Sequence, residues 1–553
     1  EIPTRLGVAG APFEANVTGD VVFTNDVSFT GSAFTKKGAG TLVVPEKILA
    51  SPETVVVEAG TLKLTDAGGI AGTTSTEGEI RLASGARLDL NQGAESVGAW
   101  GAGGSTLNKT IYVEGAGPDG EGAIYNSQTT PTGEAGSFVS RMVLTGDTTI
   151  GGGAVSSCGA AGAGSSITGG DFTLTTKNRA SDTEGYRFKA TAFDLARLNV
   201  EGAAAWSGVQ TGTIADGIHA FDGSTLVFDS ATLPETMPLC LEPGAAVGVQ
   251  HKGTVVADGA LTIGEGAVMT IRGAGDFKFT GAVTNAGTVV LSETGGLIFA
   301  GTELQGGTYQ SDAHHVWFSG TIDSPESDIT LRGGASSSFV LGLGDVGVGL
   351  PVFHSVTVES AKDVWVLAGT NVVMDGVWTS LMDASGRGEG AVRLNNMVAS
   401  STTTVENVTW NVNDLLVGWK NVRYGNVVVG SNATINVARV METAADGENA
   451  LATSVVLKEG ATLNCTSSNA GDLRFARYLS DQNSAGGLGT GQIHSFTIDG
   501  GTYSAPNAAT QFGRGSDYFY TFLKAGLMDV KGLQVRTLDP WRDNLHGEGV
   551  IQT

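Results

Sequence analysis

Short alternations of apolar and polar residues run along most of the chain. Examples are TLVV at 41–44, TLKL at 61–64, STLVFDS at 224–230 and TVVL at 288–291. Alternation with a period of two predicts half-buried β-strands, and the Gly, Asp, Asn and Ser residues between these segments predict tight corners. Few segments have helical periodicity, so we expect an all-β protein.

Glycines at the predicted corners recur at a nearly constant distance along the chain. They are Gly40 and Gly60, 20 residues apart, and Gly223, Gly244, Gly266, Gly287 and Gly307, separated by 21, 22, 21 and 20 residues. Each such unit is too short to bury its own apolar face, whereas stacked units form a continuous core. The period therefore predicts an elongated β-solenoid (β-helix) with coils of about 20–25 residues.

A series of antiparallel β-sandwiches is the alternative architecture. It would also show many short strands, with turn signals about every 8 to 12 residues. A sandwich has no reason to repeat one corner phrase at a fixed distance, but a stacked coil must place its corner in register with the coil below. The solenoid is therefore preferred.

The spacing divides the chain into three segments. Residues 1–310 are expected to form a regular solenoid, 311–470 an irregular continuation with longer loops, and 471–553 the C-terminal coils and a cap. The corner glycines after residue 310 lie further apart, as between Gly460 and Gly501. An N-cap Ser516 followed by an apolar run predicts a short helix over Ser516–Leu533, as part of the cap.

Composition and charge narrow the function classes. The chain has 553 residues with 83 Gly and 41% hydrophobic residues, which neither a disordered linker nor collagen would show together. Lys and Arg number 32 against 56 Asp and Glu, a net charge of −24. Nucleic-acid binding depends on clustered basic charge, so a nucleic-acid partner is not expected.

The cysteines and the apolar runs exclude further kinds of structure and site. Cys158, Cys240 and Cys465 lie far apart, which indicates neither a disulfide framework nor a zinc site. Cys465 alternates with Leu463, so we expect a buried free thiol. No apolar run is long enough for a membrane-spanning helix. The chain begins at Glu1 with no signal-peptide pattern, as a processed exported protein or an excised fragment does.

The segment TKKGAGTLVV at 35–44, together with VEAGTL at 57–62, resembles the passenger-associated transport repeat of bacterial autotransporter-like surface proteins. That pattern runs K-x-G-x-G-T-L-x-L and then V-x-x-G-T-L. The matching residues are Lys36, Gly38, Gly40, Thr41, Leu42, Val44, Val57, Gly60, Thr61 and Leu62. The connecting residues PEKILASPET depart from the family. The resemblance implies a β-helical passenger displayed on a bacterial surface, and it implies no catalytic residue.

Tryptophans are the main candidates for ligand contact. Five of the eight lie between residues 317 and 419, and aromatic rings on the outside of a β-helix can stack against sugar rings. The candidates for contact with a glycan or a partner are Trp317, Trp365, Trp378 and Trp419. Trp410 shares its alternation face with Val408 and Val412, so it is expected in the core.

Catalytic motifs are missing from the sequence. It has no G-x-S-x-G elbow, H-E-x-x-H motif, Walker loop or EF-hand loop. We therefore expect no enzyme, cofactor or metal, but an extracellular or bacterial cell-surface protein with a structural or adhesive role. Its expected partners are copies of itself in fibres or layers, or a surface glycan. The alternatives are a carbohydrate-binding adhesin and, ranked last, a polysaccharide lyase or glycoside hydrolase on a β-helix.

Overall fold

The structure is a computed structural model of the chain. It describes residues 4–6, 11–23, 27–29, 32–44, 53–64, 78–91, 106–127, 138–153, 155–157, 165–178, 186–293, 295–311, 314–333, 338–341, 351–359, 363–366, 370–380, 391–394, 400–417, 424–443, 452–469, 472–475, 493–512, 518–535, 544–547 and 550–552.

The chain divides into two compact units, unit 1 (Glu1–Phe277) and unit 2 (Lys278–Thr553). Each is built from stacked parallel β-strands, and the described residues contain no helix. No helix in that part of the chain is therefore available to cross a membrane.

The strands of unit 1 are β1 (Thr4–Leu6), β2 (Phe13–Asn16), β3 (Val21–Val22), β4 (Val27–Phe29), β5 (Ala33–Lys37), β6 (Thr41–Val44), β7 (Thr54–Val57), β8 (Gly60–Leu64), β9 (Glu79–Leu82), β10 (Ala86–Asp89), β11 (Thr106–Gly115), β12 (Ile124–Asn126), β13 (Phe138–Gly152), β14 (Val155–Ser157), β15 (Ser165–Thr168), β16 (Thr173–Asn178), β17 (Tyr186–Lys189), β18 (Thr191–Leu195), β19 (Arg197–Val200), β20 (Ala203–Val209), β21 (Thr211–Ile214), β22 (Ile218–Ala220), β23 (Thr225–Leu233), β24 (Leu239–Leu241), β25 (Ala246–Lys252), β26 (Val255–Ala257), β27 (Leu261–Ile263) and β28 (Val268–Ala274).

The boundary between the units falls within β29 (Asp276–Phe279). The strands of unit 2 are β30 (Val283–Asn285), β31 (Thr288–Leu291), β32 (Gly296–Phe299), β33 (Leu304–Gln305), β34 (Thr308–Ser311), β35 (His315–Phe318), β36 (Asp323–Gly333), β37 (Ser338–Leu341), β38 (Val352–Val358), β39 (Asp363–Val366), β40 (Thr370–Ser380), β41 (Ala391–Leu394), β42 (Ser400–Val417), β43 (Tyr424–Val429), β44 (Thr434–Thr443), β45 (Ala452–Lys458), β46 (Thr462–Cys465), β47 (Leu473–Phe475), β48 (Ile493–Phe512), β49 (Tyr518–Val535), β50 (Asn544–Gly547) and β51 (Val550–Gln552).

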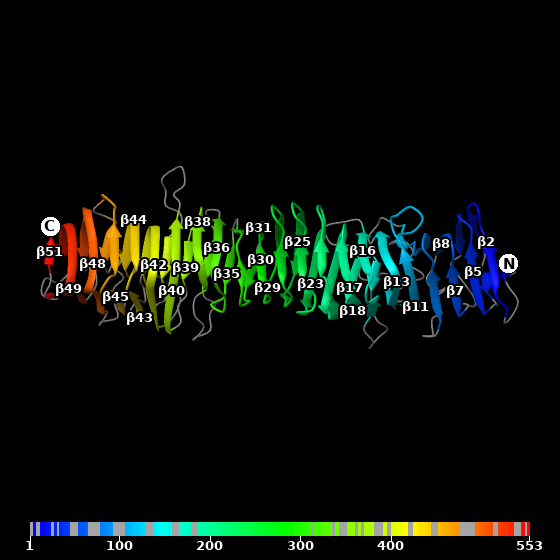
Figure 1. Ribbon diagram of the computed structural model, residues 1–553, viewed down its shortest axis with the longest axis horizontal. Coiled ribbons are helices and arrows are strands. Elements are labelled where there is room, and N and C mark those ends of the chain that lie inside the picture. The colour runs from blue at the N-terminus through cyan, green and yellow to red at the C-terminus, as the bar shows by residue number, and fades with distance from the viewer. Residues whose placement is uncertain are drawn as a thin grey trace, which may run out of the picture. The chain divides into compact units, whose positions relative to one another are not determined.

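Strands of successive turns pair in parallel register, as Figure 1 shows for β5 and β7. In unit 1, Thr41 of β6 pairs with Thr61 of β8, 20 residues later. In unit 2, Thr288 of β31 pairs with Thr308 of β34, also 20 residues later. The predicted fold class, an all-β solenoid with coils of this length, is confirmed.

The alternation in the sequence becomes the two sides of each strand. In β6 and β8, half-buried residues alternate with buried ones, and Leu42, Val44, Leu62 and Leu64 are at most 1% exposed. Because the strands pair in register, Leu42 lies directly beside Leu62 and Val44 beside Leu64. Burying a side chain of this size contributes about 1.5–3 kcal/mol relative to exposing it, so the inward columns supply most of the stabilisation.

Aromatic residues extend these columns in both units. In unit 1, Trp206 stacks on Phe228 with ring centroids 5.0 Å apart. In unit 2, Phe299 stacks between Phe279 and Phe318, at centroid distances of 5.7 and 5.5 Å. These rings occupy equivalent inward positions in consecutive turns.

Two inward positions were predicted from alternation in unit 2. Trp410 is 0% exposed, as expected for a core residue. Cys465 is a buried free thiol, also as expected, and burial raises its pKa to about 12. A thiol with this pKa stays protonated and unreactive at neutral pH.

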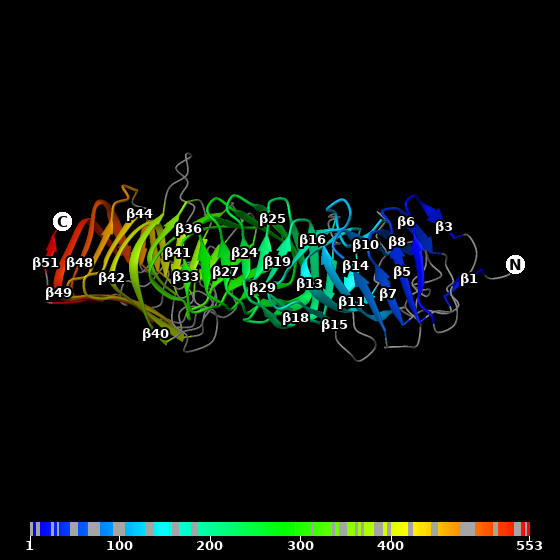
Figure 2. The ribbon, with the colours of Figure 1, turned by 45° about the vertical axis from the view of Figure 1, so that its right-hand side comes forward.

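The helix expected over Ser516–Leu533 is wrong, because residues 518–535 form strand β49. It pairs in parallel with β48, and Figure 2 shows it stacked with the other strands of unit 2. Thr521 and Leu523 are buried while Phe522 is half-buried, which is the two-residue period of a strand. A short apolar run is compatible with either element, and here the neighbouring turn decides in favour of a strand.

The outer faces carry their own repeats. Asn436 donates from Nδ2 to Asn411 Oδ1 over 2.8 Å, and Asn464 donates in the same way to Asn436, also over 2.8 Å. The three asparagines are in register on β42, β44 and β46. Polar side chains thus bond from one turn to the next outside the core.

Candidate functional site

Five of the seven predicted corner glycines have a left-handed backbone. Their φ values are 67° at Gly60, 74° at Gly223, 74° at Gly244, 69° at Gly266 and 88° at Gly307. The other two, Gly40 and Gly287, lie outside that region of φ. At Gly40 a Cβ atom would collide with the backbone carbonyl of Gly19, so this glycine is required by the close approach of two turns.

Lys36, within the segment TKKGAGTLVV at 35–44, lies at a corner beside Gly38, Gly40 and Gly60. Its side chain points inward from β5, is fully buried, and donates from Nζ to the carbonyl oxygens of Gly38, Gly40 and Ala59 at 2.6, 2.6 and 2.7 Å. Burial lowers the pKa of Lys36. The ammonium group thus joins two successive turns at their corner, which gives the Lys and Gly positions of the segment a structural role.

The candidate tryptophans that the structure describes are divided between two rows of the solenoid. Trp317 on β35 is half-buried, with its ring 6.1 Å from that of His315. Trp317 and Trp365 are both in register with Val340, so they share one row with a strand between them. Trp378 is in register with the buried Trp410, in another row. Trp419 lies outside the described residues. Contact of these residues with a glycan or a partner stays a prediction.

A charged cluster lies on the outer face of β19 and β22. Glu242 accepts from Arg197 Nη2 at 2.9 Å and lies 2.7 Å from His219 Nδ1, while Asp216 lies 3.3 Å from Arg197 Nη1. Arg197 faces the carboxylates of Asp216 and Glu242, and Glu242 also faces the imidazole of His219. The side chains of this cluster bond to one another on the surface of unit 1. We therefore interpret the cluster as a structural feature and not as a binding site.

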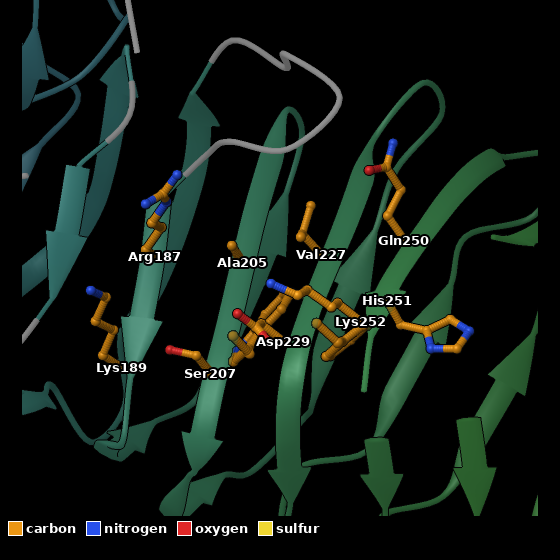
Figure 3. A pocket seen from close by; sticks show the side chains of 11 residues that line it. Arg187, Lys189, Ala205, Ser207, Val227, Asp229, Gln250, His251 and Lys252 are labelled. Carbon is orange, nitrogen blue, oxygen red and sulfur yellow. The ribbon is translucent and has the colours of Figure 1, made fainter. Parts of the chain in front are cut away.

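An outer-face pocket in unit 1, here called the β20 pocket, lies over strands β17, β20, β23 and β25 (Figure 3). Its volume is about 590 Å³, within the range of ligand sites. Strand register sets the outward residues in two rows. The first row is Arg187, Ala205, Val227 and Gln250, and the second row is Lys189, Ser207, Asp229 and Lys252.

The β20 pocket exists because small side chains stand between long ones in both rows. Ala205 and Ser207 of β20 leave the hollow, and Figure 3 shows Arg187 and Lys189 on one side of them and Lys252 on the other. No single segment of sequence carries this arrangement. The sequence reasoning missed it because the register that aligns residues about 20 apart is visible only in the folded chain.

Metal ligands do not gather in the described part of the chain, where no group of three or more His, Cys, Asp or Glu side chains is placed to hold an ion. Comparison of the sequence and structure with protein-family models, curated proteins and solved structures found no match.

Proposed function

We propose that this protein is a structural or adhesive element of a bacterial cell surface, secreted or displayed, and that its copies assemble into fibres or layers. The observation that carries the proposal is the in-register parallel stacking in both units, where each turn buries its apolar face against the next. Such a stack is a self-supporting scaffold that presents polar faces outward.

The corner at Lys36 also supports the proposal. The residues that resemble the transport repeat of autotransporter-like proteins form this corner, with glycines in close contact and a lysine holding three carbonyl oxygens. These residues act in the architecture itself, which fits a protein whose role is mechanical. The net charge of −24 keeps the outer faces soluble until a partner or a cation screens them.

Electron microscopy of the purified chain tests assembly. We expect ordered filaments or sheets as protein concentration and Ca²⁺ or Mg²⁺ are raised, because divalent cations screen the acidic faces. Single particles under all these conditions would overturn self-assembly. Antibody labelling of intact cells that produce the protein tests display, since a surface protein is labelled without permeabilising the cell.

A further inference from the structure

The imidazole of His251 on β25 is a titratable group inside the core of unit 1. The residue is 5% exposed, and neither ring nitrogen has a hydrogen-bond partner among the described residues. Buried polar groups normally have such a partner, because burying one unpaired costs free energy. This position is therefore unfavourable for a neutral imidazole and much more so for a charged one.

His251 continues the inward aromatic column of unit 1. It is in register with Phe228 of β23, and its ring meets that of Phe277 edge-on, with the centroids 5.5 Å apart. In the next turn it is in register with Gly273 of β28, where a Cβ atom would come 2.9 Å from His251 Cδ2. The in-register residues of the two neighbouring turns therefore offer the ring no polar side chain.

The charged side chains near His251 are directed away from the core. On β23, β25, β28 and β29 they all occupy outward positions of the alternation, and they are Asp229, Lys252, Arg272, Asp276 and Lys278. The carboxylate of Asp276 and the nearby backbone of Gly253 favour the protonated ring, but burial outweighs both, so the pKa of His251 is lowered. The contribution of the neutral ring to stability is therefore complete above about pH 6.5 and is lost as pH falls through the lowered pKa.

From this geometry we propose that His251 is an acid-sensitive switch in unit 1, and that a proton on its ring opens the turn that contains β25. The charged ring gains water only when β25 separates from its paired strands, β23 and β28. Each turn of a solenoid contacts only its neighbours, so the opening is confined to this part of unit 1. The inference goes beyond the scaffold role and concerns single chains, so failure of assembly or of surface display does not affect it.

His219 is the matched comparison, because it and His251 are the two histidines in the sequence of unit 1. It lies on β22 at the outer face, where its ring nitrogens are 2.7 Å from a carboxylate oxygen of Glu242 and 3.4 Å from one of Asp216. A proton on His219 therefore faces carboxylates, whereas a proton on His251 faces aromatic rings. We expect the histidine-dependent acid response of unit 1 to come from His251.

Hydrogen exchange followed by mass spectrometry tests the proposal on the full chain. The protection of the amides of β25 is compared at about pH 7.5 and about pH 5.5, a range in which histidine titrates and ordinary carboxylates do not. After correction for intrinsic exchange rates, β25 should lose protection at least about tenfold at the lower pH, because an unpaired charge is then buried. The amides of β31 in unit 2 should keep theirs. No loss at β25, or an equal loss at β31, would overturn the proposal.

Variants assign the acid response to one ring. His251→Phe cannot take up a proton and matches its aromatic neighbours, so β25 should keep its protection at both pH values. If circular dichroism shows that His251→Phe does not fold, His251→Leu removes the same titration with a smaller side chain. His219→Gln should respond to acid as the unaltered chain does. An acid response that persists in a folded His251 variant, or that disappears in His219→Gln, would overturn the assignment to His251.

Discussion

At the scale of single residues, neighbouring lysines on β5 have opposite roles. Lys36 is buried against three carbonyl oxygens, while Lys37 points outward to Glu14 at 2.9 Å. The alternation of one strand is enough to make one lysine part of the core and the other part of the surface. Two adjacent residues of the same type thus provide an internal comparison.

Replacing these lysines by methionine should separate the two roles. Lys36→Met leaves three corner carbonyls without their donor, and we expect the free energy of unfolding to fall by about 2 kcal/mol. Lys37→Met removes only the surface ion pairs with Glu14 and Glu58 and should cost much less than Lys36→Met. Chemical denaturation of both variants measures the difference, and equal losses would contradict the role assigned to Lys36.

Corner glycines differ in how much space a side chain would have at their positions. Gly60 and Gly223 both have positive φ, but a Cβ atom at Gly60 would come 2.5 Å from Gly40 O, whereas Gly223 has no atom within 4 Å of that position. Gly223→Ala should therefore cost about 1–2 kcal/mol for backbone strain alone. Gly60→Ala should cost clearly more, as measured by denaturation. A smaller loss at Gly60 than at Gly223 would show that the turns can separate freely.

An exposed ion pair in unit 2 should make the stability of the folded chain depend on pH. Asp328 accepts from Ser355 and lies 2.7 Å from His354 Nδ1; these hydrogen bonds lower the pKa of Asp328, and the bond to Asp328 raises the pKa of His354. The aspartate contribution to stability is lost as pH falls through its lowered pKa. The histidine contribution is complete below about pH 6.5 and is lost as pH rises through its raised pKa.

The pair therefore stabilises most between about pH 4 and 6.5. In Asp328→Asn the pKa of His354 should return toward its ordinary value, as followed by NMR titration of the ring protons. An unchanged titration in this variant would mean that another group sets the pKa of His354.

At the scale of elements, the fold was predictable because each strand carries the same local pattern. Alternation identified segments such as β6, β8 and β31, and the glycine period identified their stacking. The error at β49 shows the limit of local reasoning, because an apolar run has no period of its own until a paired neighbour imposes one. The β20 pocket was not predictable, since it joins four strands whose alignment depends on turn length.

The aromatic column of unit 2 should be sensitive to cavities. Phe299 contacts rings on both sides and is 1% exposed. Phe299→Ala should lower the free energy of unfolding by about 3–5 kcal/mol because it leaves a cavity between two turns. Phe299→Leu keeps most of the volume and should cost less than about 1.5 kcal/mol. Similar costs for both variants in thermal denaturation would contradict tight packing in this column.

At the scale of the whole molecule, each unit has a core of its own. Stacked turns contact only their neighbours, so cooperativity need not extend over all 553 residues. We expect denaturant unfolding to depart from a single two-state transition. Trp206→Ala should shift one step and Phe299→Ala another, as followed by circular dichroism. A single transition shifted equally by both variants would show that the chain unfolds as one unit.

The in-register pairing of turns also limits which insertions and deletions the chain can accommodate. A deletion of one residue within β6 or β8 would turn the inward side chains on one side of the deletion outward and disturb the pairing of that strand with the neighbouring turns. A tandem duplication or loss of one whole repeat restores the alignment at both of its ends. Gain or loss of a whole repeat should therefore be tolerated better than a one-residue deletion within a strand.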